Sequence, residues 1–234
     1  MRILVIQHSD LEHAGAFRAL MARDGHEMIT CTAPRDIGDV DLDRIDGLWV
    51  MGGPMQVWEA EELPWLAREI EVIREAVVSR KLPYFGICLG HQLLAHALGG
   101  HVSRATESEV GLLDVQKHGQ APMFAGLPEQ FACFQWHSAE VRRLPDGATV
   151  SAFSSRCGNQ AMTWGSSVQS VQFHAELDAE TLADWYRIDD CEAMLRTEIG
   201  PAADNVFTEL AEAEPALARM REGLYRHWIE GAGA

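Results

Sequence analysis

The chain has 234 residues, of which 47% are hydrophobic and 23% charged, an ordinary composition for a globular protein with one large domain. Asp and Glu number 35 against 19 Lys and Arg, so the net charge is −16. This charge argues against nucleic acid and against an anionic membrane surface as partners, because both are bound through cationic side chains. A small molecule or another protein is the expected partner.

The N-terminal apolar run ends at Ile6, which is too short for the core of a signal peptide. No run approaches the ~18 apolar residues of a membrane span. The five cysteines are widely spaced and form no C-x-x-C pair. Free thiols in a reducing compartment fit this pattern, so we expect a cytoplasmic protein.

Strand and helix patterns alternate through the first hundred residues. Ser9 and Glu12 have the spacing of a capping box, which predicts a helix through Phe17. Pro64 opens a second helix with an apolar stripe, and a third helix is expected at residues 90–98. Between them, short apolar runs predict buried strands at residues 2–7, 26–31, 46–51 and 82–87.

The second half of the chain changes character. Residues 101–117 and 131–164 carry short β-type runs and turns, which indicate added antiparallel strands. Residues 167–174 predict one further strand of the main sheet. From the expected N-cap at Asp178 the pattern is helical, and a final helix is expected over residues 216–229. The whole predicts an α/β fold with a mostly parallel sheet and helices on both faces.

A single cysteine stands in G-I-C-L-G, residues 86–90, where a predicted strand turns into a helix. Such a corner exposes the central side chain above the carboxyl edge of the sheet, and glycines let the backbone pass. The helix N-terminus favours the thiolate of Cys88, and the amide of Leu89 faces a developing oxyanion. The alternative interpretation is a buried structural cysteine.

Two further strand ends carry groups that a cysteine nucleophile needs. His174 in Q-F-H-A-E is a candidate base, and Glu176 lies two residues on, where it can orient the ring. M-G-G-P provides Gly53, whose backbone can turn an amide toward a ligand. Taken alone, each segment also fits a surface histidine or an ordinary turn. Together they place acyl-transfer groups along one sheet edge.

G-I-C-L-G-H-Q, Q-F-H-A-E and M-G-G-P resemble the motifs of class I (triad) glutamine amidotransferases over residues 1–177. The resemblance implies a flavodoxin-like domain at 1–177, with residues 178–234 as a helical extension packed on it. It implies Cys88 as nucleophile, His174 as base and Glu176 as orienting group, and oxyanion amides from Gly53 and Leu89. It further implies glutamine contacts from Gln92, His137 and Ser138. No metal or organic cofactor is implied.

One position departs from the family pattern, which usually has proline after the histidine, whereas this chain has Ala175. We expect Glu176 to be held less rigidly but to remain functional.

Three functions stay open at this point. The chain resembles stand-alone relatives of the amidotransferase domain of GMP synthase, and it shows no P-loop. It is either a glutaminase that hands ammonia to a separate synthetase subunit or a free-standing γ-glutamyl hydrolase. A catalytically silent interaction protein on the same fold is the third alternative, with the aromatic residues of the helical tail as a docking surface or, more simply, as core.

Overall fold

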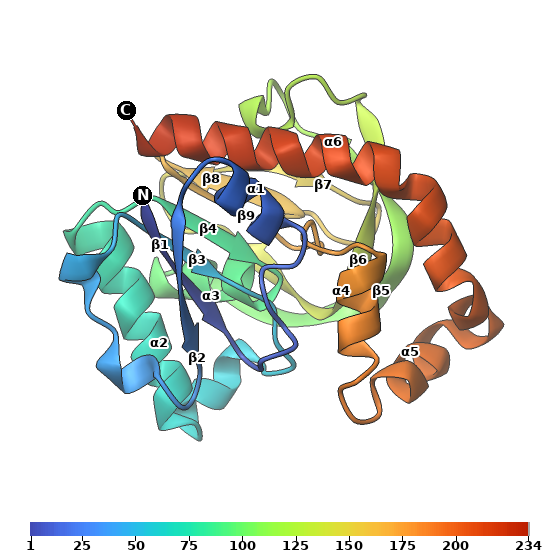
Figure 1. Cartoon of the computed structure of the whole chain (residues 1–234), viewed down its shortest axis with the longest axis horizontal. Helices are drawn as coiled ribbons and strands as arrows, with labels where there is room; N and C mark the ends of the chain where they lie inside the picture. The colour runs from blue at the N-terminus through green and yellow to red at the C-terminus, as the bar shows by residue number, and fades with distance from the viewer. Residues whose placement is uncertain (234) are drawn as a thin grey trace.

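The computed structural model describes residues 1–233 (Figure 1). Nine strands form one sheet in the order β2-β1-β3-β4-β9-β8-β7-β5-β6. The first five positions are parallel strands: β2 (Glu27–Thr32), β1 (Arg2–Gln7), β3 (Gly47–Val50), β4 (Tyr84–Ile87) and β9 (Val168–Val171). The other four pairings are antiparallel and involve β8 (Ala161–Trp164), β7 (Ala148–Phe153), β5 (His101–Lys117) and β6 (Gln130–Arg143).

The parallel half has the strand order of flavodoxin-like folds, in which the direction of winding reverses beside the first strand. This confirms the predicted α/β class and the added antiparallel strands, although these make up half of the pairings. The helices are α1 (Phe17–Arg23), α2 (Pro64–Arg74), α3 (Leu89–Ala97), α4 (Ala179–Trp185), α5 (Cys191–Ile199) and α6 (Val206–Ala232). Shorter helical turns cover Ile37–Asp39, Leu42–Arg44, Val57–Glu61, Glu75–Ser79, Pro122–Phe124 and Gly200–Asn205. None of the helices within residues 1–233 is long and apolar enough to cross a bilayer.

The parallel strands are buried on both faces. Successive residues of β1 alternate between two cores: Ile3 and Val5 pack with α1 and α6, and Leu4 and Ile6 pack with α2 and α3. This alternation follows from the two-residue period of a strand. In Figure 1, α6 runs along the sheet on the same side as α1. Helices therefore cover both faces of the parallel strands, and the loops at the carboxyl ends of these strands lie at the edge of the sheet rather than under these helices.

Three boundaries differ from the sequence-based expectations. Ser9 does not begin a helix, because its hydroxyl accepts from the amides of Leu11 and Glu12 in a turn and α1 starts only at Phe17. The strand expected to reach residue 174 ends at Val171. The last helix starts ten residues earlier than expected and continues through Pro215, because buried residues on either side of the proline pack it onto the core.

The four tail aromatics are mostly core. Tyr225 and Trp228 are among the largest fully buried side chains, and Trp185 is buried as well, while Tyr186 is partly buried against the same cluster. They therefore form no exposed docking surface. Asp178 caps α4 as expected, accepting from the amide of Thr181 at 2.8 Å. The domain boundary after residue 177 stays a prediction.

Candidate active site

Cys88 occupies the corner between β4 and α3. Its backbone lies at φ 51° and ψ −102°, a conformation that L-residues rarely adopt. The flanking glycines make the corner sterically possible: a Cβ on Gly90 would lie 2.1 Å from the carbonyl oxygen of Val50, and one on Gly86 would lie 2.7 Å from the backbone of Gly90. The thiol is 3.7 Å from the side-chain amide nitrogen of Gln172 and 3.8 Å from the backbone carbonyl oxygen of Trp136. The strained corner presents the sulfur above the sheet edge.

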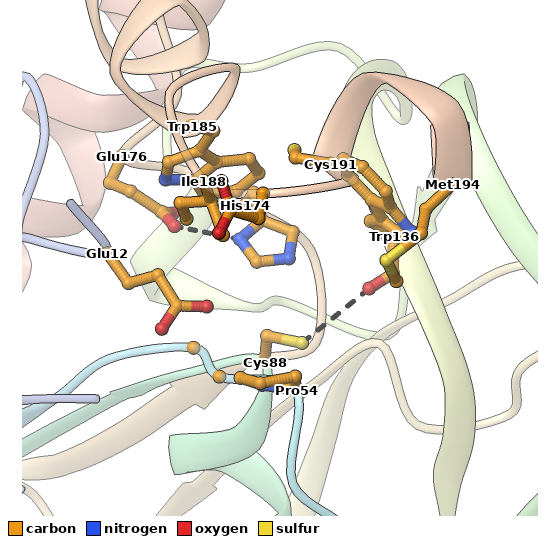
Figure 2. Close-up of a pocket in the computed structure, with 13 residues that line it drawn as sticks. Glu12, Pro54, Cys88, Trp136, His174, Glu176, Trp185, Ile188, Cys191 and Met194 are labelled. Carbon is orange, nitrogen blue, oxygen red and sulfur yellow. Dashed lines mark hydrogen bonds and ion pairs between the residues drawn. The ribbon is translucent and has the colours of Figure 1, made fainter. Parts of the chain in front are cut away.

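His174 and Glu176 face the same space. The Nδ1 atom of His174 lies 2.7 Å from the carboxylate of Glu176, and both side chains are buried (Figure 2). A turn after β9, rather than the strand itself, brings the two together. The ring of Trp185 packs edge-to-face on His174 at 4.9 Å. Because one ring nitrogen is held by Glu176, the other is left to face the thiol.

The electrostatics of this pair favour a protonated imidazole. Burial alone lowers the pKa of His174, but the negative charges of Glu176 and Cys88 outweigh it and raise that pKa well above its ordinary value. A thiolate beside an imidazolium is the charge state that cysteine acyl chemistry requires.

The glycine loop after β3 lies against both side chains. A Cβ on Gly52 would come within 3.0 Å of His174 Cε1 and 3.5 Å of Cys88 Cβ. Next to it, Gly53 lines the cavities beside the thiol. Leu89 is the first residue of α3, where an amide N–H has no acceptor within its own helix. Gly53 and Leu89 thus line the same cavity as Cys88, and the orientation of their amides toward an oxyanion stays a prediction.

The three residues expected to contact substrate share one wall. Gln92, His137 and Ser138 line a cavity of about 250 Å³, here called the strand-side cavity. The amide nitrogen of Gln92 already donates to the carbonyl of Ala139 and to Gln172, each at 3.1 Å. The ring of His137 is likewise committed, lying 3.2 Å from the carboxylate of Glu109. Only Ser138 has an exposed side chain, so the first two hold the wall in shape.

Comparison with known proteins identifies the family. The sequence profile described as glutamine amidotransferase class-I matches residues 16–186. The chain belongs to the class I glutamine amidotransferases. It is 33% identical over 177 residues to a glutamine-hydrolyzing GMP synthase from Caldicellulosiruptor saccharolyticus, covering 71% of this chain and 32% of that protein. It is 36% identical over 138 residues to a glutamine-hydrolyzing GMP synthase subunit from Saccharolobus solfataricus, covering 58% and 70% of the two chains.

Solved structures agree with this amidotransferase fold. The crystal structure of a glutamine amidotransferase from Thermotoga maritima has a TM-score of 0.86 and 27% identity, covering 97% of this chain and 98% of that one. A second, from Methylobacillus flagellatus, also scores 0.86 with 28% identity, covering 98% and 94%. The curated relatives are matched only in part: the chain spans about a third of the first GMP synthase and 57% of the corresponding GMP synthase subunit from Methanococcus maripaludis.

A buried ion pair lies next to the candidate site, and neither of its members was among the site residues expected from the sequence. His8 follows β1, and its Nε2 lies 3.2 Å from Glu69, with both side chains fully buried. Its Nδ1 donates to the carbonyl oxygen of Gly52 at 2.7 Å. That carbonyl and the N–H of Gly53 belong to one planar peptide, so fixing the first directs the second. The signal was available, because His8 is a polar residue directly after a buried strand.

The His174–Glu176 segment is held by a second long-range contact. Arg221 of α6 is buried and donates to the carbonyl oxygens of Ala175 at 3.1 Å and Leu177 at 3.0 Å. The carbonyl oxygen of Glu176 accepts from Ala16 at 3.0 Å. Three successive carbonyls are thus fixed from outside the segment. These contacts hold the backbone on both sides of Glu176, and the looser link expected from Ala175 stays a prediction.

A second cavity, of about 170 Å³, adjoins Cys88 on its other side and is here called the helix-side cavity. Glu12, His174 and Glu176 line it together with residues of α4, α5 and the turn between them. Figure 2 shows the carboxylate of Glu12 directed into this space, near Cys88 and His174. Sequence analysis had taken Glu12 for a helix-capping residue, so its place in the site was missed.

Proposed function

We propose that this chain hydrolyses the γ-amide bond of a γ-glutamyl compound, with glutamine as the simplest substrate, through a cysteine thioester. The observation that carries the proposal is the arrangement at one cavity of a strained cysteine corner and a histidine bonded to a buried carboxylate. Membership of the class I glutamine amidotransferases supports it independently. In the curated relatives, glutamine hydrolysis is part of the protein's name.

In the proposed mechanism the thiolate of Cys88 attacks the γ-carbonyl carbon. The resulting oxyanion accepts hydrogen bonds from the amides of Gly53 and Leu89. Because these backbone dipoles are already oriented, they stabilise the oxyanion without reorganising. The imidazolium of His174 protonates the departing nitrogen, and the C–N bond breaks to leave a γ-glutamyl thioester. His174 then removes a proton from water, which attacks the thioester and releases glutamate and the thiolate.

Glu176 acts by orientation and charge. Its contact with Nδ1 fixes which nitrogen of His174 faces the thiol, and its charge stabilises the imidazolium. We propose that Ser138 and the carbonyl oxygen of Gln92 contact the glutamyl moiety in the strand-side cavity. His137 contributes through its backbone, since its ring is engaged by Glu109.

Two settings fit this chemistry. Relatives named as subunits of GMP synthase favour a glutaminase that meets a separate synthetase subunit. A free-standing γ-glutamyl hydrolase is the other setting. A cytoplasmic location is proposed for either, because all five cysteines are free and buried thiols.

The test is release of glutamate from L-glutamine and from γ-glutamyl amides by the purified chain, with Cys88→Ala as control. We expect turnover that Cys88→Ala abolishes. Alkylation of Cys88 by iodoacetamide near neutral pH is measured in parallel. An inert protein whose Cys88 reacts no faster than an ordinary thiol would exclude the enzyme and leave the silent-scaffold alternative.

A further inference from the structure

The two cavities divide the substrate at Cys88. They share a border made by Gly53, Pro54, Cys88, Trp136 and Met194, but His174 and Glu176 line only the helix-side cavity. If His174 protonates the departing nitrogen, as the proposed function requires, that nitrogen leaves on the helix side. Whatever is attached to the nitrogen must then occupy the helix-side cavity, while the glutamyl portion occupies the strand-side cavity.

The helix-side cavity is far larger than ammonia needs. Its volume of about 170 Å³ compares with the ~30 Å³ that one water molecule occupies in the liquid, and ammonia is of similar size. The walls are two indole rings, Trp136 and Trp185, with Ile188 and Met194 beside them. An apolar cavity of this size gains free energy by excluding water around an apolar ligand. Its dimensions and walls therefore suit a substituted amine with a hydrocarbon chain.

Two carboxyl groups besides Glu176 line this cavity. The carboxylate of Glu12 points into it, and Asp189 lies on the same lining. Glu12 forms no ion pair within residues 1–233; the nearby His8 is itself paired with Glu69. Burial raises the pKa of Glu12, and the charge of His8 only partly offsets this. A cationic ligand group would stabilise the ionised carboxylate, and the indole faces also favour a cation.

The helical segment after β9 supplies one wall of this cavity. Trp185, Ile188 and Met194 all belong to that segment, and Cys191 at the start of α5 lies on the same lining. These side chains give a leaving group larger than ammonia an apolar surface to contact.

We propose that the helix-side cavity binds the amine portion of an N-substituted γ-glutamyl amide, whose hydrocarbon chain packs against the contacting indole rings of Trp136 and Trp185 and whose second, cationic group pairs with Glu12. The reaction balances as in glutamine hydrolysis: the C–N bond breaks, His174 supplies the proton, and the products are glutamate and the free diamine. This inference rests on the proposed hydrolytic function and names the class of its leaving group.

The test compares three substrates on the intact chain. They are L-glutamine, γ-glutamyl-pentylamide, and γ-glutamyl-5-aminopentylamide, which differs from the second only by a terminal ammonium. We expect kcat/KM to rise in that order, with at least a tenfold gain from the ammonium. Glu12→Gln should remove that gain, so that the aminopentylamide and the pentylamide are hydrolysed with similar kcat/KM. Glu209→Gln, on the exposed surface of α6, is the matched control and should change nothing.

The outcomes separate the two proposals. Cys88-dependent hydrolysis of glutamine, with both amides poorer than glutamine, would overturn the amine site and leave the hydrolytic function standing. A preference for the amides without any effect of the ammonium would overturn the assignment of Glu12. Hydrolysis of none of the three would count against the proposed function itself. The wild-type substrate order decides the matter even if Glu12→Gln does not fold.

Discussion

The two cavities beside Cys88 are built by different kinds of interaction. The strand-side cavity has walls whose polar groups already bond to one another, since both Gln92 and the ring of His137 donate to the carbonyl oxygen of Ala139. The helix-side cavity has aromatic and aliphatic walls from β6 and from the segment of α4 and α5, and a carboxylate without an ion-pair partner among residues 1–233. Hydrogen-bonded walls keep one geometry, whereas packed side chains can be exchanged singly. The comparison suggests that the glutamyl side is fixed and that the amine side sets substrate choice.

The strongest test of this division is Glu176→Gln, because the orientation of His174 serves both sides alike. We expect kcat to fall on the order of 10³-fold or more, as when the orienting carboxylate of a catalytic triad is neutralised. Steady-state kinetics with glutamine and with an N-alkyl amide should show equal losses. A loss confined to one substrate would break the division.

A smaller effect is expected from Gly53→Ala. The added Cβ would lie 2.8 Å from the ring of His8, so the loop must shift and its amide must turn away from the oxyanion. Loss of one such donor costs about 10²-fold in kcat. Gly38→Ala, with open space around it, is the control. Unchanged kcat in a folded Gly53→Ala protein would mean that this amide does not stabilise the transition state.

His8→Gln should affect stability more than rate. It leaves Glu69 buried and unpaired, which costs about 3–5 kcal/mol of unfolding free energy. Adding Glu69→Gln should recover much of that stability, while kcat stays about tenfold low because Gly52 loses its donor. Urea unfolding and steady-state rates on the two variants measure this; recovery of both properties would contradict a positioning role.

The same pair has a predictable pH dependence. Burial lowers the pKa of His8, but the charge of Glu69 and the hydrogen bonds to Glu69 and to the carbonyl of Gly52 together outweigh it, and the net pKa is raised. The contribution of His8 to the unfolding free energy is therefore fully present below about pH 6.5, and it is lost as the pH rises through the raised pKa of the folded state.

The smallest effect on rate is expected at His91, which bonds Ser170 inside the fold. Burial lowers its pKa to about 3. Between pH 6 and 4, His91 binds a proton in the unfolded chain but stays neutral in the folded one. Each pH unit of acidification in this range therefore lowers the unfolding free energy by about 1.4 kcal/mol. We expect the unfolding free energy, measured with urea at each pH, to fall less steeply with acidification for His91→Asn than for the wild type. An identical dependence on pH would contradict the buried neutral ring.

Local sequence patterns were sufficient to predict the segments at the strand ends. They were insufficient to predict the long-range contacts that hold those segments in place. The glycines of residues 86–90 and the alternation of strands and helices identified the corner of Cys88 from the sequence. Pairs such as His8 with Glu69, 61 residues apart, or Arg221 with Ala175, 46 apart, leave no local trace. Ser9 and Glu12 matched a capping box by spacing alone, because spacing cannot distinguish a helix start from an isolated turn.

The hydrogen bonds from Arg221 to the backbone on either side of Glu176 form late in the synthesis of the chain. During synthesis His174 and Glu176 leave the ribosome before the guanidinium that holds the backbone around them, since Arg221 follows Ala175 by 46 residues. A nascent chain that has exposed Cys88, His174 and Glu176 therefore still lacks the contact that fixes their geometry. We expect the thiol of such a chain to react slowly until α6 docks, so that hydrolysis begins only after this helix has folded.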